Sequence, residues 1–218
     1  MNKLNLLRSL PIPKRKLEKR SFSKTEDHIR ISRKYDFDYF DGSRDYGYGG
    51  YKYDGRWIPV AVDIINFFNL KIGSKILDVG CAKGFLMHDL KNLKMDVYGL
   101  DISSYAKLNA MENIKDRIII GDQMKLPFQD NYFDLVLSIN TLHNLDKSNC
   151  EDAIKELTRV AKIKSNIFIQ VDSYETNQEK EIFESWVLTA KYHDYTYEWE
   201  KLFKSSDYQG YYYWTIIK

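Results

Sequence analysis

Long apolar runs and cysteines are scarce in this chain. No stretch approaches the roughly 18 apolar residues of a membrane-spanning helix, and residues 1–13 hold scattered leucines without the continuous apolar segment of a secretory signal. There are only two cysteines, Cys81 and Cys150, too few for a disulfide scaffold. These absences predict a protein of the reducing cytoplasm with no membrane span.

A strong overall charge is also missing. The formal net charge is +2 over 218 residues, which favours neither nucleic acid nor a membrane as a partner. The basic residues are concentrated in residues 1–34, where eleven Lys and Arg accompany three acids. This segment is either an arm that closes over an anionic substrate or a solvated extension, and such charge runs are usually solvated.

Aromatic residues, in contrast, are plentiful, and 17 of them are tyrosines. Residues 35–57 mix many tyrosines with five glycines and follow the period of neither a helix nor a strand. A long loop of this composition favours an ordered lid over a pocket, although its rings could simply pack on the core. We expect residues 1–57 to form an N-terminal extension and substrate-side lid. Its candidate substrate-binding residues are Tyr46, Tyr48, Tyr51 and Arg56.

Residues 58–218 follow the pattern of an α/β domain. Five short β-like runs alternate with helical segments between residues 75 and 172, and a further strand is expected at 211–217. Alternation of this kind predicts βαβ units in a Rossmann-like, doubly wound, mostly parallel sheet with helices on both faces. The five runs are 76–79, 96–101, 117–122, 133–139 and 166–171. Helices are expected from Glu151 to Ala161 and over residues 175–190.

The first of these runs leads into a glycine loop, Gly80-Cys-Ala-Lys-Gly84. Glycine permits positive φ and close approach of a ligand to the main chain, and the carboxyl end of a strand is where α/β sheets bind ligands. The spacing is not the G-x-G-x-x-G of dinucleotide sites. Asp78 inside the strand would also repel a pyrophosphate, so a nicotinamide dehydrogenase is disfavoured.

Polar residues end the later strands, at Asp101, Asp122, Asn140 and Asp172. In a parallel sheet these residues meet at one edge. An acid after the second strand accepts hydrogen bonds from two ribose hydroxyls. Together with Asp78, which suits a ligand bearing ammonium and sulfonium charges, the pattern predicts a nucleoside ligand with positive charge.

This set resembles the class I S-adenosylmethionine-dependent methyltransferases. Ile76 to Gly84 is similar to their motif I, hydrophobic-x-D-x-G-x-G-x-G, with Ala82 at the middle glycine. The resemblance covers residues 57–172 and implies S-adenosylmethionine as cofactor, with S-adenosylhomocysteine as product. The tyrosine-rich stretch and Gly210-Tyr-Tyr-Tyr-Trp-Thr also resemble a bacterial branch found beside surface-polysaccharide or small-metabolite genes.

The resemblance also implies roles for individual residues. The glycine loop would line the methionine part of the cofactor, with Asp78 near its amino group, Asp101 at the ribose and Asp122 at the adenine amino group. Asn140 would close over the cofactor. The implied cofactor-binding set is Asp78, Gly80, Cys81, Ala82, Gly84, Asp101, Ile102, Asp122, Gln123, Met124 and Asn140.

A hydroxyl acceptor requires a base to take its proton. His143, three residues past Asn140, is the first candidate and is also a candidate substrate-binding residue, and Asp172 is the second. Packing or capping roles are the alternatives for both. The sequence lacks ligand pairs at helical spacing on this edge, so no metal is expected.

The sequence therefore predicts a methyltransferase acting on a small-molecule or sugar-like acceptor, with O-methylation by in-line displacement and base assistance. No Asn-Pro-Pro-Tyr-like signature follows the fourth strand, which disfavours methylation of base amino groups and nucleic acid as a partner. Two alternatives stay open. One is an RNA or protein methyltransferase that uses the basic arm, and the other is a catalytically silent cofactor-binding protein.

Overall fold

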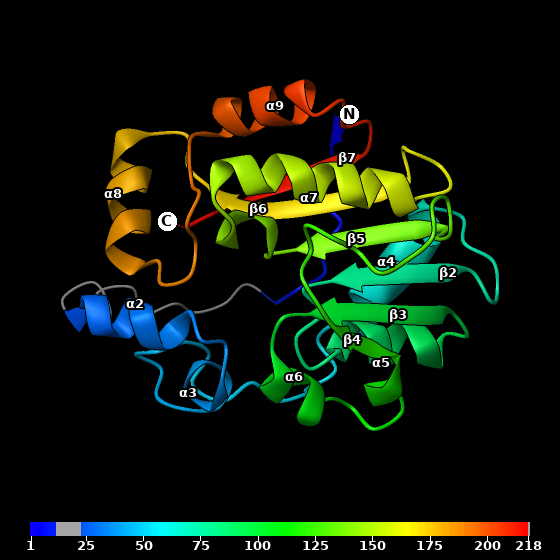
Figure 1. The fold of residues 1–218 in the computed structure, drawn as a ribbon, viewed down its shortest axis with the longest axis horizontal. Coiled ribbons are helices and arrows are strands. Elements are labelled where there is room, and N and C mark those ends of the chain that lie inside the picture. The colour runs from blue at the N-terminus through cyan, green and yellow to red at the C-terminus, as the bar shows by residue number, and fades with distance from the viewer. Residues whose placement is uncertain (12–22, 218) are drawn as a thin grey trace.

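A single parallel sheet organises the fold (Figure 1). The computed structural model describes residues 1–11 and 23–217. The sheet has seven strands in the order β1-β7-β6-β5-β2-β3-β4, and every neighbouring pair is parallel. The expected Rossmann-like α/β sheet is confirmed. Its strands are β1 Asn2–Lys3, β2 Lys75–Val79, β3 Asp96–Asp101, β4 Ile118–Ile120, β5 Leu135–Ile139, β6 Ile167–Ser173 and β7 Tyr211–Ile216.

Helices cover both faces of this sheet. Successive side chains of β2 point to opposite faces, so Leu77 packs with α7 and α9, whereas Ile76 packs with α4 and α5. Short 3-10 turns, η1 Lys115–Arg117 and η2 Leu142–Asn144, follow α6 and β5. The helices are α2 Glu26–Ser32, α3 Phe37–Phe40, α4 Ile58–Phe67, α5 Phe85–Asn92, α6 Ser104–Leu108, α7 Lys147–Val160, α8 Asn177–Trp186 and α9 Thr196–Ser205.

Several helix ends differ from the sequence pattern. A helix expected over residues 175–190 starts at Asn177, because Thr176 and Glu179 form a capping box. It ends at Trp186, where Val187 becomes extended. The helix expected from Glu151 begins one turn earlier, at Lys147, which adds the buried Cys150 to its inward face.

The N-terminal residues contribute to the sheet. β1 pairs with β7 through Asn2 and Tyr211, and Leu6 is buried. β7 itself is parallel to β6. The first residues of the chain therefore form the outermost strand at this end of the sheet. Five of the eleven basic residues of residues 1–34, at positions 14–20, lie outside the described residues, so both interpretations of this segment, arm and solvated extension, stay predictions.

Residues 23–57, here called the cap, lie beside the carboxyl ends of the central strands (Figure 1). The cap contains α2, α3 and the tyrosine-rich loop. On one side Arg33 donates to the carbonyl of Ala190 over 3.1 Å. On the other side Tyr53 donates to Asp89 on α5 over 2.5 Å.

Within the described residues, none of the helices is both long and apolar enough to cross a membrane.

Candidate functional site

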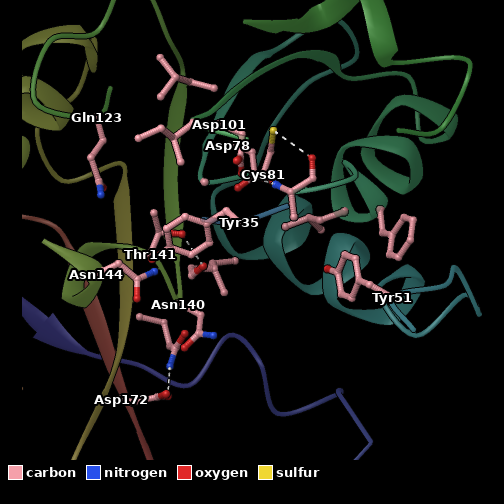
Figure 2. A pocket seen from close by; sticks show the side chains of 18 of the residues that line it. Tyr35, Tyr51, Asp78, Cys81, Asp101, Gln123, Asn140, Thr141, Asn144 and Asp172 are labelled. Atoms are coloured by element: carbon pink, nitrogen blue, oxygen red, sulfur yellow. Dashed lines mark hydrogen bonds between the residues drawn. The ribbon is translucent and has the colours of Figure 1, made fainter. Parts of the chain in front are cut away.

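One large cavity opens at the carboxyl edge of the sheet, beneath the cap. Its volume is about 890 Å³, within the range of small-molecule and cofactor sites. The ends of the strands, the N-terminal residues 5–11 and the cap provide its walls. Figure 2 shows Asp78 and Asp101 side by side, with Asn140 and Asp172 further along the cavity.

The expected cofactor residues all line this cavity except Gly84. Gly84 has φ +70°, and a Cβ there would lie 2.3 Å from Cδ1 of Ile114, so packing behind the loop requires glycine. At Gly80, with φ +79°, a Cβ would lie 2.0 Å from Oγ1 of Thr141. Both glycines are therefore required by close contacts of the loop with the protein itself.

Ala82, at the middle glycine position of the motif, also has positive φ, at +50°. Its N–H donates to Oδ2 of Asp101 over 2.7 Å, and the N–H of Ser103 donates to Oδ1 over 2.8 Å. Asp101 is buried, and burial raises its pKa. Its carboxylate thus joins the glycine loop to the end of β3 and still lines the cavity.

The carboxyl group of Asp78 lacks a partner among the described residues. Asp78 is 6% exposed and lines the cavity, and no described residue donates a hydrogen bond to its carboxyl group or forms an ion pair with it. Burial, and secondarily the neighbouring Asp101, raise its pKa to about 7. A buried carboxylate without a partner is costly, and a ligand ammonium group would compensate that cost.

The end of the cavity beyond Asp101 suits the adenine ring. Gln123 is 9% exposed, and its buried Oε1 has no hydrogen-bond partner among the described residues. An amide oxygen of this kind can accept from an amino group. Asp122 is exposed and accepts the N–H of Met124 over 2.9 Å. Gln123 therefore fits the adenine amino group better than Asp122, which the sequence favoured.

The other end of the cavity is polar. Asn140 adopts φ +57°, and with its amide nitrogen toward Asp172 it lies 3.3 Å from both carboxylate oxygens. Gln170 donates to Oδ1 of Asp172 over 3.4 Å and to Oγ1 of Thr215 over 2.7 Å. Asp172 is 8% exposed and lines the cavity. It can accept a proton from a group bound there.

The sequence predicted that His143 faces the acceptor as a base, but the structure places its ring elsewhere. The ring is buried at 3% exposure and does not line the cavity. Its Nδ1 accepts the N–H of Asp172 over 3.0 Å, and burial lowers its pKa. The reason is that η2 turns directly after β5 and packs against β6, which directs His143 behind the wall.

Of the four cap residues predicted to bind the substrate, some line the cavity and one does not. Tyr48, Tyr51 and Arg56 line the cavity. Tyr46 does not, and its ring lies 5.3 Å from the ring of His28. The guanidinium of Arg56 is half exposed and 2.5 Å from Asp54. It is therefore already paired at the cavity mouth.

Other residues that line or support the cavity were not singled out by any local pattern in the sequence. Asn144 lines the cavity and its buried Oδ1 has no partner among the described residues. Tyr35 and the N-terminal Leu7 are also wall residues. Lys83, inside the glycine loop, is buried and contacts Asp41 of the cap. The cavity wall and the contact between Lys83 and Asp41 bring together segments that are far apart in the chain. The spacing of residues along the sequence could therefore not reveal them.

Comparisons with known proteins agree with this geometry. Residues 77–169 match the methyltransferase domain family. An uncharacterized protein of Methanocaldococcus jannaschii is 32% identical over 130 residues, covering 59% of this chain and 54% of that protein. A 24-methylenesterol C-methyltransferase of Arabidopsis thaliana is 34% identical over 143 residues, covering 62% and 34%. The chain thus spans about half or less of the length of these curated relatives.

Among solved structures, a putative methyltransferase of Bacillus halodurans superposes with a TM-score of 0.53 at 18% identity, covering 67% of each chain. This likeness shows the shared fold. The cavity of this fold holds two groups that a ligand could pair with, the carboxyl group of Asp78 and the buried Oε1 of Gln123. Residues 77–169 therefore carry a methyltransferase domain by their match to this family, and S-adenosylmethionine is the cofactor that the domain indicates.

Proposed function

We propose that this protein transfers a methyl group from S-adenosylmethionine to a hydroxyl group of a small, sugar-like acceptor. The observation that supports the proposal is one continuous cavity with two different ends. Asp78 and Asp101 lie at the cofactor end, and Asp172 lies at the other. A donor and an acceptor can therefore be held in one enclosed space, which is the main requirement of a transfer reaction.

The chemistry of the far end supports a hydroxylated acceptor. Carboxamides of Asn140, Asn144 and Gln170 line it, with the hydroxyl of Thr215 beside them. Tyr213, which pairs with Gln170 in the sheet, adds aromatic surface. Polar groups that both donate and accept hydrogen bonds, next to flat apolar faces, match a sugar-like molecule with several hydroxyls. The same set supports the resemblance to enzymes of surface-polysaccharide or small-metabolite synthesis.

Asp172 is the proposed base. The cofactor supplies a methyl group on a positively charged sulfur, which keeps the bonding electron pair when the acceptor oxygen takes the methyl. Asp172 accepts the proton of the acceptor hydroxyl, and Asn140 and Gln170 fix the orientation of its carboxylate. The tyrosines of the cap exclude water from the same space.

Titration calorimetry with S-adenosylhomocysteine and with NAD tests the cofactor site. We expect binding of S-adenosylhomocysteine and none of NAD, and the reverse result would overturn the proposal. The acceptor is tested by following S-adenosylhomocysteine release with a panel of sugars, sugar nucleotides, phenols, tRNA and peptides. An ether methyl on a sugar-like product supports the proposal, whereas methylated tRNA or peptide would replace the acceptor class. Binding without turnover on any acceptor would indicate a silent cofactor-binding protein.

A further inference from the structure

A buried ion pair joins the glycine loop to the cap. Nζ of Lys83 lies 2.6 Å from Oδ2 of Asp41, and their side chains are 8% and 21% exposed. Among the ion pairs of the described residues, this lysine is the least exposed basic partner. The two residues are 42 positions apart in the chain. Their contact therefore fixes two distant segments against each other.

Neighbouring groups complete the hydrogen bonding of this pair. The hydroxyl of Tyr105, on α6, donates to Oδ2 of Asp41 over 2.7 Å, and the N–H of Tyr51 donates to Oδ1 over 3.1 Å. Lys83 also donates to the carbonyl of Tyr51 over 3.0 Å. Burial opposes ionisation of Asp41, but the hydrogen bonds from Lys83 and Tyr105 lower its pKa overall. A buried charge pair with these additional bonds is well satisfied.

The pair lies directly behind the cofactor end of the cavity. Lys83 follows Ala82, whose N–H is bound to Asp101. Neither Lys83 nor Asp41 lines the cavity, but Tyr51 does, and its ring stacks on Phe85 with centroids 4.6 Å apart. The ion pair thus acts on the cavity through Tyr51, which is held by both of its members.

We propose that Lys83 and Asp41 form a latch that holds the cap closed over bound cofactor. Lys83 is a positioning residue, because it reaches the cavity only through Tyr51 and the loop at Ala82. In this proposal the cap moves when S-adenosylhomocysteine leaves, so the strength of the latch sets the rate of its release. This inference rests on the proposed cofactor site and is independent of the acceptor.

The first test is the dissociation rate of S-adenosylhomocysteine from the full chain, measured by surface plasmon resonance. Lys83→Met should raise this rate about tenfold or more, the factor expected for loss of one charge-assisted hydrogen bond. Lys155→Met is the matched control, because Lys155 and Asp152 form an exposed pair on α7 at 3.0 Å. The control should leave the rate unchanged.

The double variant Lys83→Met/Asp41→Asn separates a latch from general stabilisation. Lys83→Met alone leaves a partly buried carboxylate without its charged partner, which lowers the free energy of unfolding. The double variant removes both charges and should recover part of that stability, while dissociation stays fast. Recovery of slow dissociation together with stability would show that the ion pair acts only on folding, and would overturn the proposal.

Limited trypsin digestion supplies a readout without any ligand. The cap contains trypsin sites at Arg44 and Lys52, and Lys83→Met should speed cleavage there while residues of the sheet stay protected. Unchanged cleavage and unchanged dissociation would overturn the latch. If Lys83→Met does not fold, Tyr105→Phe, which removes one hydrogen bond to Asp41, decides by the same measurements. A wild-type protein that binds no S-adenosylhomocysteine would contradict the proposed function, and the digestion result would still decide the latch.

Discussion

The main-chain N–H of Asp172 donates a hydrogen bond of 3.0 Å to Nδ1 of His143. Since Nδ1 accepts this bond, the proton of the neutral imidazole lies on Nε2. Burial lowers the pKa of His143 and so favours the neutral ring. The relationship makes His143 a support for the strand end that carries Asp172, and it leaves the carboxylate of Asp172 as the group that faces the cavity.

Substitution of these two residues should have different effects on turnover. Asp172→Asn keeps the shape of the side chain but removes the base, so we expect kcat to fall by about 10²–10⁴ with little change in affinity for S-adenosylhomocysteine. His143→Ala should lower kcat less, because it loosens Asp172 without removing it. Steady-state kinetics on the identified acceptor measure both. A smaller loss in Asp172→Asn than in His143→Ala would return the role of base to the histidine.

Binding of S-adenosylhomocysteine should depend on pH through Asp78. The pKa of this carboxyl group is about 7 in the ligand-free protein, and only its ionised form pairs with the ligand ammonium. Affinity should therefore rise by about tenfold between pH 6 and pH 8, as the ionised fraction grows from roughly a tenth to nine tenths. Calorimetry across this range measures it. Asp78→Asn should abolish the slope, whereas Asp122→Asn, at an exposed carboxylate, should keep it.

The same carboxyl group should make the ligand-free protein less stable as pH rises. Its pKa is raised from 3.8 in the unfolded chain to about 7 in the native state. The native state therefore binds the extra proton, and the free energy of unfolding falls between about pH 4 and pH 7. Urea denaturation at several pH values measures this fall. Asp78→Asn should flatten it and be more stable than the wild type at pH 8, and a less stable Asp78→Asn protein would contradict the assignment.

The proposed contact of Asp101 with the ribose can be tested separately from its hydrogen bonds to the glycine loop. Asp101→Ala should weaken binding of adenosine about tenfold to a hundredfold, as expected for lost hydrogen bonds from ribose hydroxyls to a carboxylate. It also removes the bonds to Ala82 and Ser103, so loop damage could mimic this loss. Competition binding with 2′,3′-dideoxyadenosine distinguishes the two effects, because this ligand lacks the hydroxyls. An equal loss for both ligands would rule out the ribose contact.

Ala82→Gly should preserve or increase stability. Ala82 has φ +50°, a left-handed conformation that costs an alanine about 1 kcal/mol and costs glycine little. The gain is partly offset by the greater freedom of glycine in the unfolded chain, so we expect a change between zero and about +1 kcal/mol. Ala153→Gly, within α7, is the control and should cost about 1 kcal/mol. Chemical denaturation compares the free energies of unfolding of the two variants. A destabilised Ala82→Gly protein would contradict the backbone strain inferred at Ala82.

The strands near the site, and the polar residues that end them, followed from local patterns. Apolar runs such as Val97–Leu100, and the acid that follows this one, are visible in the sequence because burial on both faces of a parallel strand favours continuous apolar residues. The carboxyl ends of the strands then meet at one edge for geometric reasons. The same patterns did not indicate β1, since two residues, Asn2 and Lys3, carry no period of their own and are ordered by pairing with β7.

The sequence by itself determined the parallel sheet and its glycine loop, because both depend on residues that are close along the chain or repeat at strand ends, and the resemblance of motif I implied the cofactor. Only the tertiary structure decided the side chains that face the cavity. It turned His143 behind the wall, left Asp172 at the surface of the cavity and brought Lys83 against Asp41. These outcomes depend on how helices and the cap pack between distant segments, and packing of this kind leaves no period in the amino-acid order.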